Sequence, residues 1–380
     1  SDVCSSDLDG NDSPVVTFTY LSDKRFDTIT APDDIVTKYQ YYSDSNSADP
    51  NCGKLWKITV DYGTGGSYLN LTTEFAYDDY GNIARVTDPN GNTSVLEYDE
   101  LNQLIKTISP SPFEYVTELE YDKKGNMDKI TWDVSAGSDP NVVYDYDEMS
   151  NLVKVTDPLA HVTAYAYNAS EEPNLVTDAE DNETEIFYNE RGMVIKITDA
   201  NNNDTEFEYT DNGKLSKIID ANDNETTYTY DDFDRLTRIT YPDSTYEGFG
   251  YDKKSNITSV RNRAGQTITY SYDGMNRMIE KDRPGESAIT YTYDIAGRLK
   301  EVSDGRTVSE GGGTTSYTYD RIGRVTDVND TRSKVVSYEY DDLGRRTKLT
   351  YPDDSYITYE YDELSRLTKI KDDSSNTLAE

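Results

Sequence analysis

The chain has 380 residues and an unusual aromatic composition, with 34 Tyr against 8 Phe and 2 Trp. Its 73 Asp and Glu outweigh its 37 Lys and Arg and give a formal net charge of −36. This charge argues against nucleic acid as a partner and against an anionic membrane surface, since both attract basic proteins. No apolar run approaches the ~20 residues that cross a bilayer, so we expect no membrane insertion. Low hydropathy with high charge can indicate disorder, but Tyr forms strands and buries its ring, so we expect an ordered β-protein.

The first eight residues, 1–8, resemble a common sequencing-adapter sequence read as codons. We interpret them as an assembly artefact and leave them out of the fold prediction. On this interpretation the true N-terminus is missing, so the lack of a visible signal peptide does not argue against a secreted or cell-surface location. Cys52 is then left without a second cysteine, and we expect no disulfide framework.

Residues 9–76 are interpreted as degenerate N-terminal repeats. Phe18–Tyr20 and Lys57–Asp61 have the composition of strands, and Asp44–Gly53 resembles a loop insertion. From residue 77 onward the pattern is regular. We predict about fourteen repeats over residues 77–372, followed by a truncated tail at 373–380 without a capping element.

The regular part is built around an anchor Tyr, which recurs mostly every 21 residues and is followed by Asp in 11 of 14 copies. The fourth residue after the anchor is Gly in half of the copies. A fixed period of this kind is the signature of a repeat architecture, so these positions are the predicted structural anchors. The anchors are Tyr77, Asp78, Gly81, Tyr98, Asp99, Tyr121, Asp122, Gly125, Tyr146, Asp147, Tyr167, Tyr188, Gly192, Tyr209, Gly213, Tyr230, Asp231, Tyr251, Asp252, Tyr272, Asp273, Tyr293, Asp294, Gly297, Tyr319, Asp320, Gly323, Tyr340, Asp341, Gly344, Tyr361 and Asp362.

One copy, Glu225–Asp243, shows how each repeat is expected to fold. Residues 225–230 alternate with period two, so Tyr230 and the aromatic residue two positions earlier should share one face of a strand. A short turn follows, with a left-handed backbone position at Asp234, and then a second strand, Leu236–Thr240. Such hairpins are not stable alone, so neighbours must pair edge to edge. The predicted fold is therefore all-β, with tandem hairpins forming a long coiled sheet that makes part of a hollow shell.

The second turn of each repeat is rich in Asp, Asn, Pro and Gly, as in Asp88–Asn92. The changes in repeat length fall in this turn, for example at Trp132–Asn141 and Asp304–Ser316. We call it the rim turn and expect it on an exposed edge. The turn that follows the anchor, here called the Tyr-Asp turn, keeps its length and is expected to be buried or packed against its neighbours.

Candidate catalytic and ligand-binding residues are few. The single His, His161, lies in a rim turn and cannot build a typical zinc site by itself, so we interpret it as a turn residue. Asp199–Asp204 and Asp220–Asn224 could offer oxygen atoms to Ca²⁺, but they lack the full twelve-residue loop with its terminal Glu, and turn chemistry is favoured. We predict no catalytic residues, no metal, no cofactor and no enzymatic activity.

The anchor pair has two interpretations. In the favoured one, the Tyr residues form a ladder that packs the sheet and the Asp residues bond turn amides. In the other, exposed Tyr rings form platforms for sugars. The fifth residue after the anchor changes from Asn in early repeats, such as Asn82, to Arg in late ones, such as Arg235 and Arg366. We expect these Arg side chains to pair with Asp residues of neighbouring repeats.

The motifs Tyr77-Asp-Asp-Tyr-Gly-Asn82 and Tyr340-Asp-Asp-Leu-Gly-Arg345 resemble the YD repeats of RHS proteins, which also occur in Tc-toxin cocoon components and teneurins. The resemblance covers about residues 60–372. It implies a hollow β-shell that, in bacterial members, encloses a C-terminal toxin of the same polypeptide and frees it through a self-cleaving core. Neither that core nor a toxin segment occurs in this sequence.

From this resemblance we expect a metagenomic fragment of a structural shell. Its partner would be a C-terminal effector domain of its own full-length chain, carried for secretion or delivery. The alternative function is an extracellular carbohydrate-binding or cell-adhesion array, whose partners would be surface glycans. The two differ in where the Tyr rings point, since a shell buries them in the sheet or turns them to a lumen, whereas a binding array presents them to solvent.

Overall fold

The computed structural model describes residues 2–4, 15–43, 51–65, 68–133, 139–306, 312–332 and 334–379. These residues form strands and turns and no helix, so the predicted all-β class is confirmed. Within these ranges there is accordingly no helix of the length and apolarity needed to cross a membrane. The chain divides into two compact units. Unit 1 combines an N-terminal segment, Ser1–Glu118, with a C-terminal segment, Thr290–Glu380, and unit 2 is Leu119–Ile289.

The N-terminal segment of unit 1 contains short antiparallel strands joined in chain order. They are β1 (Asp2–Cys4), β2 (Val16–Tyr20), β3 (Phe26–Thr30), β4 (Val36–Tyr41), β5 (Leu55–Val60), β6 (Leu71–Tyr77), β7 (Ile83–Thr87), β8 (Thr93–Tyr98), β9 (Leu104–Ile108) and the start of β10 (Val116–Tyr121). The C-terminal segment contains β26 (Ile289–Tyr293), β27 (Leu299–Ser303), β28 (Thr314–Tyr319), β29 (Val325–Asp330), β30 (Val335–Tyr340), β31 (Arg346–Thr350), β32 (Tyr356–Tyr361), β33 (Leu367–Asp372) and β34 (Thr377–Ala379).

Unit 2 repeats the same hairpin along its whole length. Its strands are β11 (Met127–Trp132), β12 (Asn141–Tyr146), β13 (Leu152–Thr156), β14 (Val162–Tyr167), β15 (Pro173–Thr177), β16 (Glu183–Tyr188), β17 (Val194–Thr198), β18 (Asp204–Tyr209), β19 (Leu215–Ile219), β20 (Glu225–Tyr230), β21 (Leu236–Thr240), β22 (Tyr246–Tyr251), β23 (Ile257–Arg261), β24 (Thr267–Tyr272) and β25 (Met278–Asp282).

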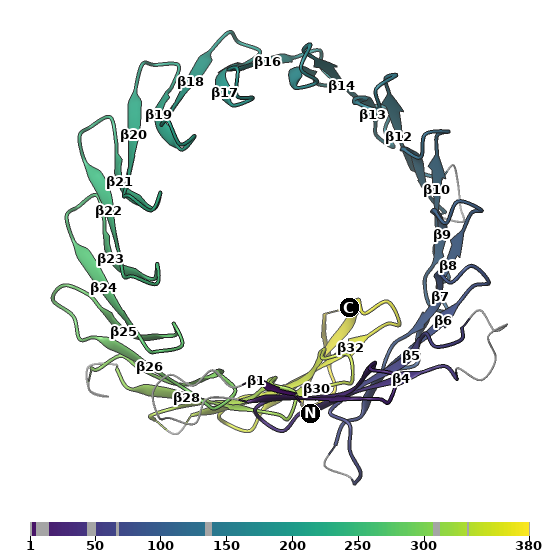
Figure 1. Ribbon diagram of the computed structural model, residues 1–380. Helices are drawn as coiled ribbons and strands as arrows, with labels where there is room; N and C mark the ends of the chain where they lie inside the picture. The colour runs from purple at the N-terminus through teal and green to yellow at the C-terminus, as the bar shows by residue number, and fades with distance from the viewer. Residues whose placement is uncertain are drawn as a thin grey trace. The chain divides into compact units, whose positions relative to one another are not determined.

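Within each unit, consecutive strands pair antiparallel, as Figure 1 shows for β18 to β24. In β20 and β21, Tyr228 lies opposite Ile239, and Tyr230 lies opposite Leu236. The register shifts by one residue between Thr229 and Tyr230, which is a β-bulge at the anchor. The same shift precedes the anchor in the neighbouring hairpins. The predicted tandem hairpins are confirmed.

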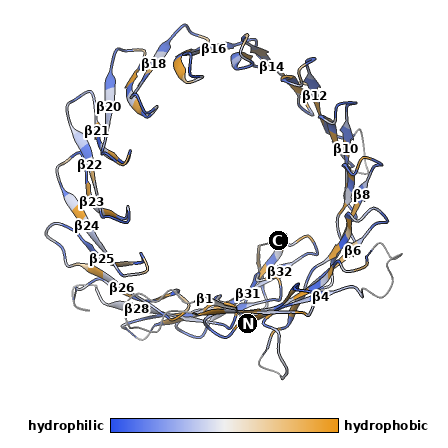
Figure 2. Cartoon of the chain, in the orientation of Figure 1, coloured by the Kyte–Doolittle hydropathy of each residue, from blue (hydrophilic) through white to orange (hydrophobic). Residues whose placement is uncertain are grey.

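The sheet has no deeply buried apolar core, because no apolar side chain among the described residues is fully buried. Hydrophobic residues are instead distributed along the strands, as the colouring in Figure 2 shows. The anchors Tyr209 and Tyr230 are half-buried, while Glu208 and Thr229, one position earlier, are exposed. The exposed face carries cross-strand ion pairs such as Lys217 with Glu208, at 3.1 Å. Such exposed pairs contribute little, so Tyr and aliphatic packing on the other face holds the sheet.

The irregular N-terminal region contains more strands than the sequence indicated. The strand pieces expected at Phe18–Tyr20 and Lys57–Asp61 correspond to β2 and β5, but β3 and β4 were missed. Tyr20 and Tyr41 end β2 and β4 and lie 21 residues apart, yet neither is followed by Asp, which is why the repeat was not recognised. Most of the expected insertion at Asp44–Gly53 lies outside the described residues.

Two other segments have a structure that the sequence did not predict. β1, within the suspected adapter segment 1–8, pairs with β2. The adapter interpretation stays a prediction. At the other end, β34 pairs with β33, so the residues taken as an uncapped tail add a strand to the sheet.

The Tyr-Asp turns as the candidate functional site

The Tyr-Asp turn is closed by two backbone hydrogen bonds. In the turn after Tyr230, Asp231 N donates to Arg235 O at 2.9 Å, and Asp234 N donates to Asp231 O at 3.0 Å. Asp234 has a φ of 60°, in the left-handed region. The left-handed position expected four residues after the anchor is present in every repeat from Tyr77 on, at Gly81, Asn102, Gly125, Ser150, Glu171, Gly192, Gly213, Asp234, Ser255, Asn276, Gly297, Gly323, Gly344 and Ser365.

The Asp after the anchor holds this turn with both carboxylate oxygens. Oδ1 of Asp231 accepts hydrogen bonds from the backbone N–H groups of Phe233 and Arg235, both at 3.0 Å. Its Oδ2 accepts from Nε of Arg235 at 2.8 Å. The hydrogen bond from Arg235 is the largest of the effects that hold the pKa of Asp231 below its usual value. In earlier repeats an Asn takes the place of this Arg, as in Asp147 with Asn151.

The anchor Tyr connects each repeat to the one before it. The phenol of Tyr230 donates to Leu215 O at 2.8 Å, and Tyr251 donates to Leu236 O at the same distance. Both acceptors begin the second strand of the preceding repeat. Burial raises the pKa of Tyr230 above its usual value. The anchor ring is thus held by packing and by its hydroxyl.

The Arg at the fifth position binds differently from the sequence-based expectation. Arg235 forms its ion pair with Asp231 of its own turn, Nη2 to Oδ2 at 2.7 Å, and not with an Asp side chain of a neighbour. It reaches the next repeat by donating from Nη1 to Asp252 O at 2.9 Å and by lying 4.7 Å from the ring centre of Tyr251. The reason is the forked guanidinium, whose Nε side faces its own turn while the far nitrogen extends along the sheet.

The Tyr-Asp turns were expected to be buried or packed against their neighbours; packing is present, as in Arg235 with Asp252, but burial is wrong for many repeats. Their tips project into solvent, with Tyr80 74%, Leu101 77% and Phe233 80% exposed. The constant length of the turn has another cause. The Asp carboxylate can bond the amides two and four residues later at one loop length, so an inserted residue would break the cap.

In unit 1, the Tyr-Asp turns of the C-terminal segment contact rim turns of the N-terminal segment. We call this contact the seam. Nη1 of Arg298 lies 3.2 Å from Oδ2 of Asp33, and Nε of Arg321 lies 2.9 Å from Oδ1 of Asp61, whose side chain is fully buried. Further along, the guanidinium of Arg366 lies 4.7 Å from the ring centre of Phe113. These partners are about 260 residues apart, and no local pattern could have paired them.

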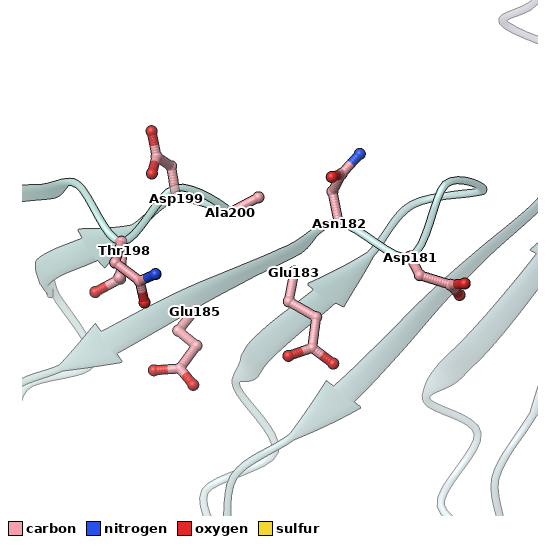
Figure 3. A pocket seen from close by; sticks show the side chains of 8 residues that line it. Asp181, Asn182, Glu183, Glu185, Thr198, Asp199 and Ala200 are labelled. Carbon is pink, nitrogen blue, oxygen red and sulfur yellow. The ribbon is translucent and has the colours of Figure 1, made fainter.

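The rim turns are built like the Tyr-Asp turns, and their acidic residues serve the turn. Oδ1 of Asp199 accepts from Asn201 N at 2.8 Å and from Asn203 N at 2.9 Å. Figure 3 shows the carboxylates of Glu183 and Glu185 on one side of their strand and that of Asp199 pointing away from them. Among the described residues, no three His, Cys, Asp or Glu side chains are placed to hold a metal ion. What the structure shows directly is that Oδ1 of Asp199 bonds the backbone of its own turn.

The single His also takes part in its own turn. Nδ1 of His161 lies 3.0 Å from Oδ2 of Asp157, and the imidazole is largely exposed. The backbone N–H of His161 also donates to Asp157 at 2.9 Å. His161 thus occupies the turn position that Asn203 fills two repeats later.

Acid and base are each expected to weaken the sheet. Because the pKa of Asp231 is lowered from 3.8 in the folded chain, its stabilising contribution is complete above about pH 3.8 and is lost as the pH falls through the folded pKa. Because the pKa of Tyr230 is raised from 10.0, its contribution is complete below about pH 10 and is lost as the pH rises through the folded pKa. The thermal midpoint, followed by circular dichroism, should be flat between about pH 5 and pH 9 and fall on both sides.

The matched control for the acid arm is Asp231→Thr, which copies the native turn at Thr210. There Oγ1 of Thr210 accepts from Lys214 N at 3.1 Å, and no carboxylate caps the turn. The variant should have a lower thermal midpoint than the parent chain at neutral pH. Its thermal midpoint should then fall less than that of the parent on acidification. An equal acid loss in both chains would show that the cap at Asp231 does not carry the effect.

Glu171 marks a repeat in which the left-handed position is strained. Its φ is 63°, where a residue with a Cβ costs about 1–2 kcal/mol. Glu171→Gly should therefore raise the free energy of unfolding by about 0.5–1 kcal/mol, measured by urea unfolding. The reverse change, Gly344→Ala, should cost about 1 kcal/mol, because φ there is 80° while the nearest atom to an added Cβ is 4.0 Å away. Equal stability of Glu171→Gly and the parent would contradict the assignment of strain.

Comparison with known proteins identifies two matching families and similar solved structures. The family described as Teneurin YD-shell matches residues 111–203, 178–312 and 287–376, and the RHS repeat family matches residues 77–114. Among solved structures, a crystal structure of TcdB2-TccC3-TEV is similar with a TM-score of 0.75 at 15% identity, over 96% of this chain and 22% of the other. The Photorhabdus luminescens Tc holotoxin pore matches with a TM-score of 0.40 at 13% identity, over 96% and 27%. No significant match was found among curated proteins.

Proposed function

We propose, because this chain belongs to the Teneurin YD-shell family, that it forms a segment of a shell wall enclosing a C-terminal effector of the same polypeptide. The family supports a shell-forming repeat. The fold likeness to the TcdB2-TccC3-TEV structure supports the same architecture, although the chain spans 22% of that chain's length. The enclosed effector, its secretion or delivery and a secreted or cell-surface location are the further parts of the proposal.

One observation supports the proposal that the chain forms a segment of a shell wall. The two residues that define the repeat form hydrogen bonds both between and within repeats. The Tyr230 phenol bonds the preceding repeat, and Asp231 caps its own turn. We propose that the Tyr-Asp pairs of this chain act as structural anchors and that the segment has no catalytic activity of its own. A rigid array of this kind resists opening because each hairpin is held by its neighbours.

The anchor geometry favours the wall over a sugar-binding array. The anchor rings are half-buried in the sheet, and their hydroxyls are bonded to the backbone, so they do not offer open stacking platforms. A glycan array probed with the purified chain should therefore give no binding that depends on the anchors. Binding that disappears in Tyr230→Ala, while the fold persists, would favour the adhesive function.

The enclosure is tested on the protein encoded by the full reading frame. We expect a self-cleaving core and an unrelated tail after residue 380, and a tail that resists added protease in the native protein but is digested once the shell is unfolded. A tail that is cleaved as fast in the native protein as in the unfolded one would contradict enclosure.

A further inference from the structure

A cluster of three side chains lies on the exposed face of the sheet in unit 2, where β21 and β23 flank β22 (Figure 1). Arg238 of β21 and Arg261 of β23 both lie directly opposite Gly248 of β22. Their guanidinium carbons lie 3.8 Å and 3.6 Å from the ring centre of Tyr246. Two groups this close to one ring centre cannot share a side of the ring, so Tyr246 is held between them. We call Arg238, Tyr246 and Arg261 the arginine–tyrosine cluster.

Gly248 leaves the space that the cluster occupies. A Cβ added to Gly248 would lie 3.7 Å from Cε2 of Tyr246, so the ring lies over bare backbone. Two repeats earlier the same position is Glu206, which lies opposite Lys196. In β22, where two Arg side chains lie opposite this position, the carboxylate is absent. The local sequence thus lacks the acid that would otherwise pair with them.

The two guanidinium groups form hydrogen bonds but no ion pair. Nε of Arg238 donates to Oγ1 of Thr240 at 3.1 Å. Nη1 of Arg261 donates to Tyr246 O at 2.7 Å and to Asn262 O at 3.2 Å. Neither group pairs with a carboxylate of the described residues, and the hydroxyl of Tyr246 has no hydrogen-bond partner among them. A guanidinium has five N–H donors, so both groups keep donors for a ligand.

Acidic residues close to the cluster do not balance its charge. Apart from the two Arg residues, the only charged residue in strands β21 to β24 is Glu247. Glu247 lies opposite Ile239 and therefore on the other face of the sheet. In the adjoining rim turn, Asp243 already pairs with Arg263 at 2.6 Å.

The strands on either side carry acids on the exposed face, but these are paired or distant. Glu225 of β20 lies 3.6 Å from Nζ of Lys217. Glu280 and Asp282 of β25 lie two strands from Arg261, about 10 Å away at the usual strand spacing. The cluster is therefore a small positive site on a chain whose net charge is −36.

We propose that the arginine–tyrosine cluster binds a doubly charged tetrahedral oxyanion, either as a free phosphate or sulfate ion or as the phosphate of a monoester. Such a group carries about two negative charges near pH 8, which balance two guanidinium groups. Arg N–H groups form strong charge-assisted hydrogen bonds with phosphate oxygens. At the edge of the Tyr246 ring, the anion would accept from both Arg residues and from the phenol. This site does not depend on whether the shell encloses an effector.

Isothermal titration calorimetry with inorganic phosphate tests the site directly. At about pH 8 and about 0.05 M sodium chloride, the purified chain should bind about one phosphate with a dissociation constant below about 10 mM. Sulfate should bind comparably, since its charge and shape are similar, whereas acetate, with one negative charge, should bind at least about tenfold more weakly. Glycerol 2-phosphate distinguishes the two sources. Tighter binding than that of the free ion assigns the site to organic phosphates, and equal or weaker binding assigns it to the ion itself.

Single changes at the two Arg residues should weaken phosphate binding. Arg238→Gln and Arg261→Gln each remove one of the two charges and should raise the dissociation constant by about tenfold or more. Arg85→Gln is the matched control. Arg85 also follows its anchor by eight residues and is exposed, but it lies opposite Ala76 and Val95, without a second Arg. This variant should bind phosphate like the parent chain.

Gly248→Glu separates ligand binding from a purely structural role of the cluster. The change keeps all three side chains and supplies a carboxylate opposite both Arg residues. The fold should persist, because an added Cβ makes only ordinary contacts there, the nearest at 3.6 Å. The thermal midpoint should equal or exceed that of the parent, while phosphate binding should weaken by about tenfold or more.

Three results would overturn the proposal. A parent chain that binds neither phosphate nor sulfate at about 20 mM would show that the cluster only covers Gly248. Unchanged phosphate binding in both Arg238→Gln and Arg261→Gln would place the anion elsewhere. Parent-like phosphate binding by Gly248→Glu would contradict the site even if circular dichroism showed that the Arg variants had lost the parent fold.

Discussion

Tyr230→Ala is expected to destabilise its own hairpin and the preceding one by about 2–4 kcal/mol, because it removes a half-buried ring and leaves Leu215 O without its phenol partner. Tyr230→Phe keeps the ring and should cost about 1 kcal/mol. Stability in a repeat array is shared mainly between neighbours, so the loss should be local. Amide hydrogen exchange should accelerate in β19, β20 and β21 and stay near the parent value in distant strands of unit 2.

The control is Tyr80→Ala. Tyr80 is 74% exposed at the tip of a Tyr-Asp turn, so its removal should change stability by less than about 0.5 kcal/mol. If Tyr80→Ala and Tyr230→Ala cost the same, the anchor position would have no special role and Tyr content alone would hold the sheet. If Tyr230→Phe lowered stability as much as Tyr230→Ala, the hydroxyl and not the ring would hold Tyr230 to the preceding repeat.

Arg321→Ala is expected to open the seam of unit 1. The change leaves the fully buried carboxylate of Asp61 without its cation, the half-exposed guanidinium of Arg321, and an unpaired buried charge is strongly destabilising. Amide exchange at the seam, at residues 61–65, 68–70 and 320–324, should rise roughly tenfold or more, while the hairpins on either side keep their protection. Only the seam is expected to open, because the hairpins are held by their own strand pairing.

A double-mutant cycle gives the matched control. Asp61→Asn removes the charge but keeps an oxygen that can accept the hydrogen bond from Leu69 N. If the ion pair holds the seam, Arg321→Ala should raise amide exchange at the seam much less in the Asp61→Asn background than in the parent. Additive effects of the two changes would show that Arg321 and Asp61 act independently and that another contact holds the seam.

Much of the local fold could be predicted from the sequence. The all-β class and the tandem hairpins follow from the 21-residue spacing and from the period-two alternation in segments such as 225–230. The left-handed position follows as well, because Gly, Asn and Asp, which occupy it in most repeats, tolerate positive φ. Ser150, Ser255, Ser365 and Glu171 are exceptions, and they adopt a similar φ because the rest of the turn imposes it.

The misses have a common physical origin. β3 and β4 were overlooked because Tyr20 and Tyr41 lack the following Asp, although the strands still pair through their backbone. The partner of Arg235 was assigned to the wrong residue, since sequence spacing does not tell which nitrogen of a guanidinium faces which repeat. Burial of the Tyr-Asp turn was inferred from its constant length, which hydrogen-bond geometry within the turn explains without burial.

The sequence by itself determined the contacts that span one repeat or less. Asp231 caps an amide four residues away and Tyr230 bonds a carbonyl 15 residues away, so a pattern with a period of 21 contains both partners. Only the tertiary structure decided which Tyr-Asp turns are covered and which are open. Asp33, Asp61 and Phe113 meet Arg298, Arg321 and Arg366 across about 260 residues, and a pattern that repeats every 21 residues does not link partners so far apart.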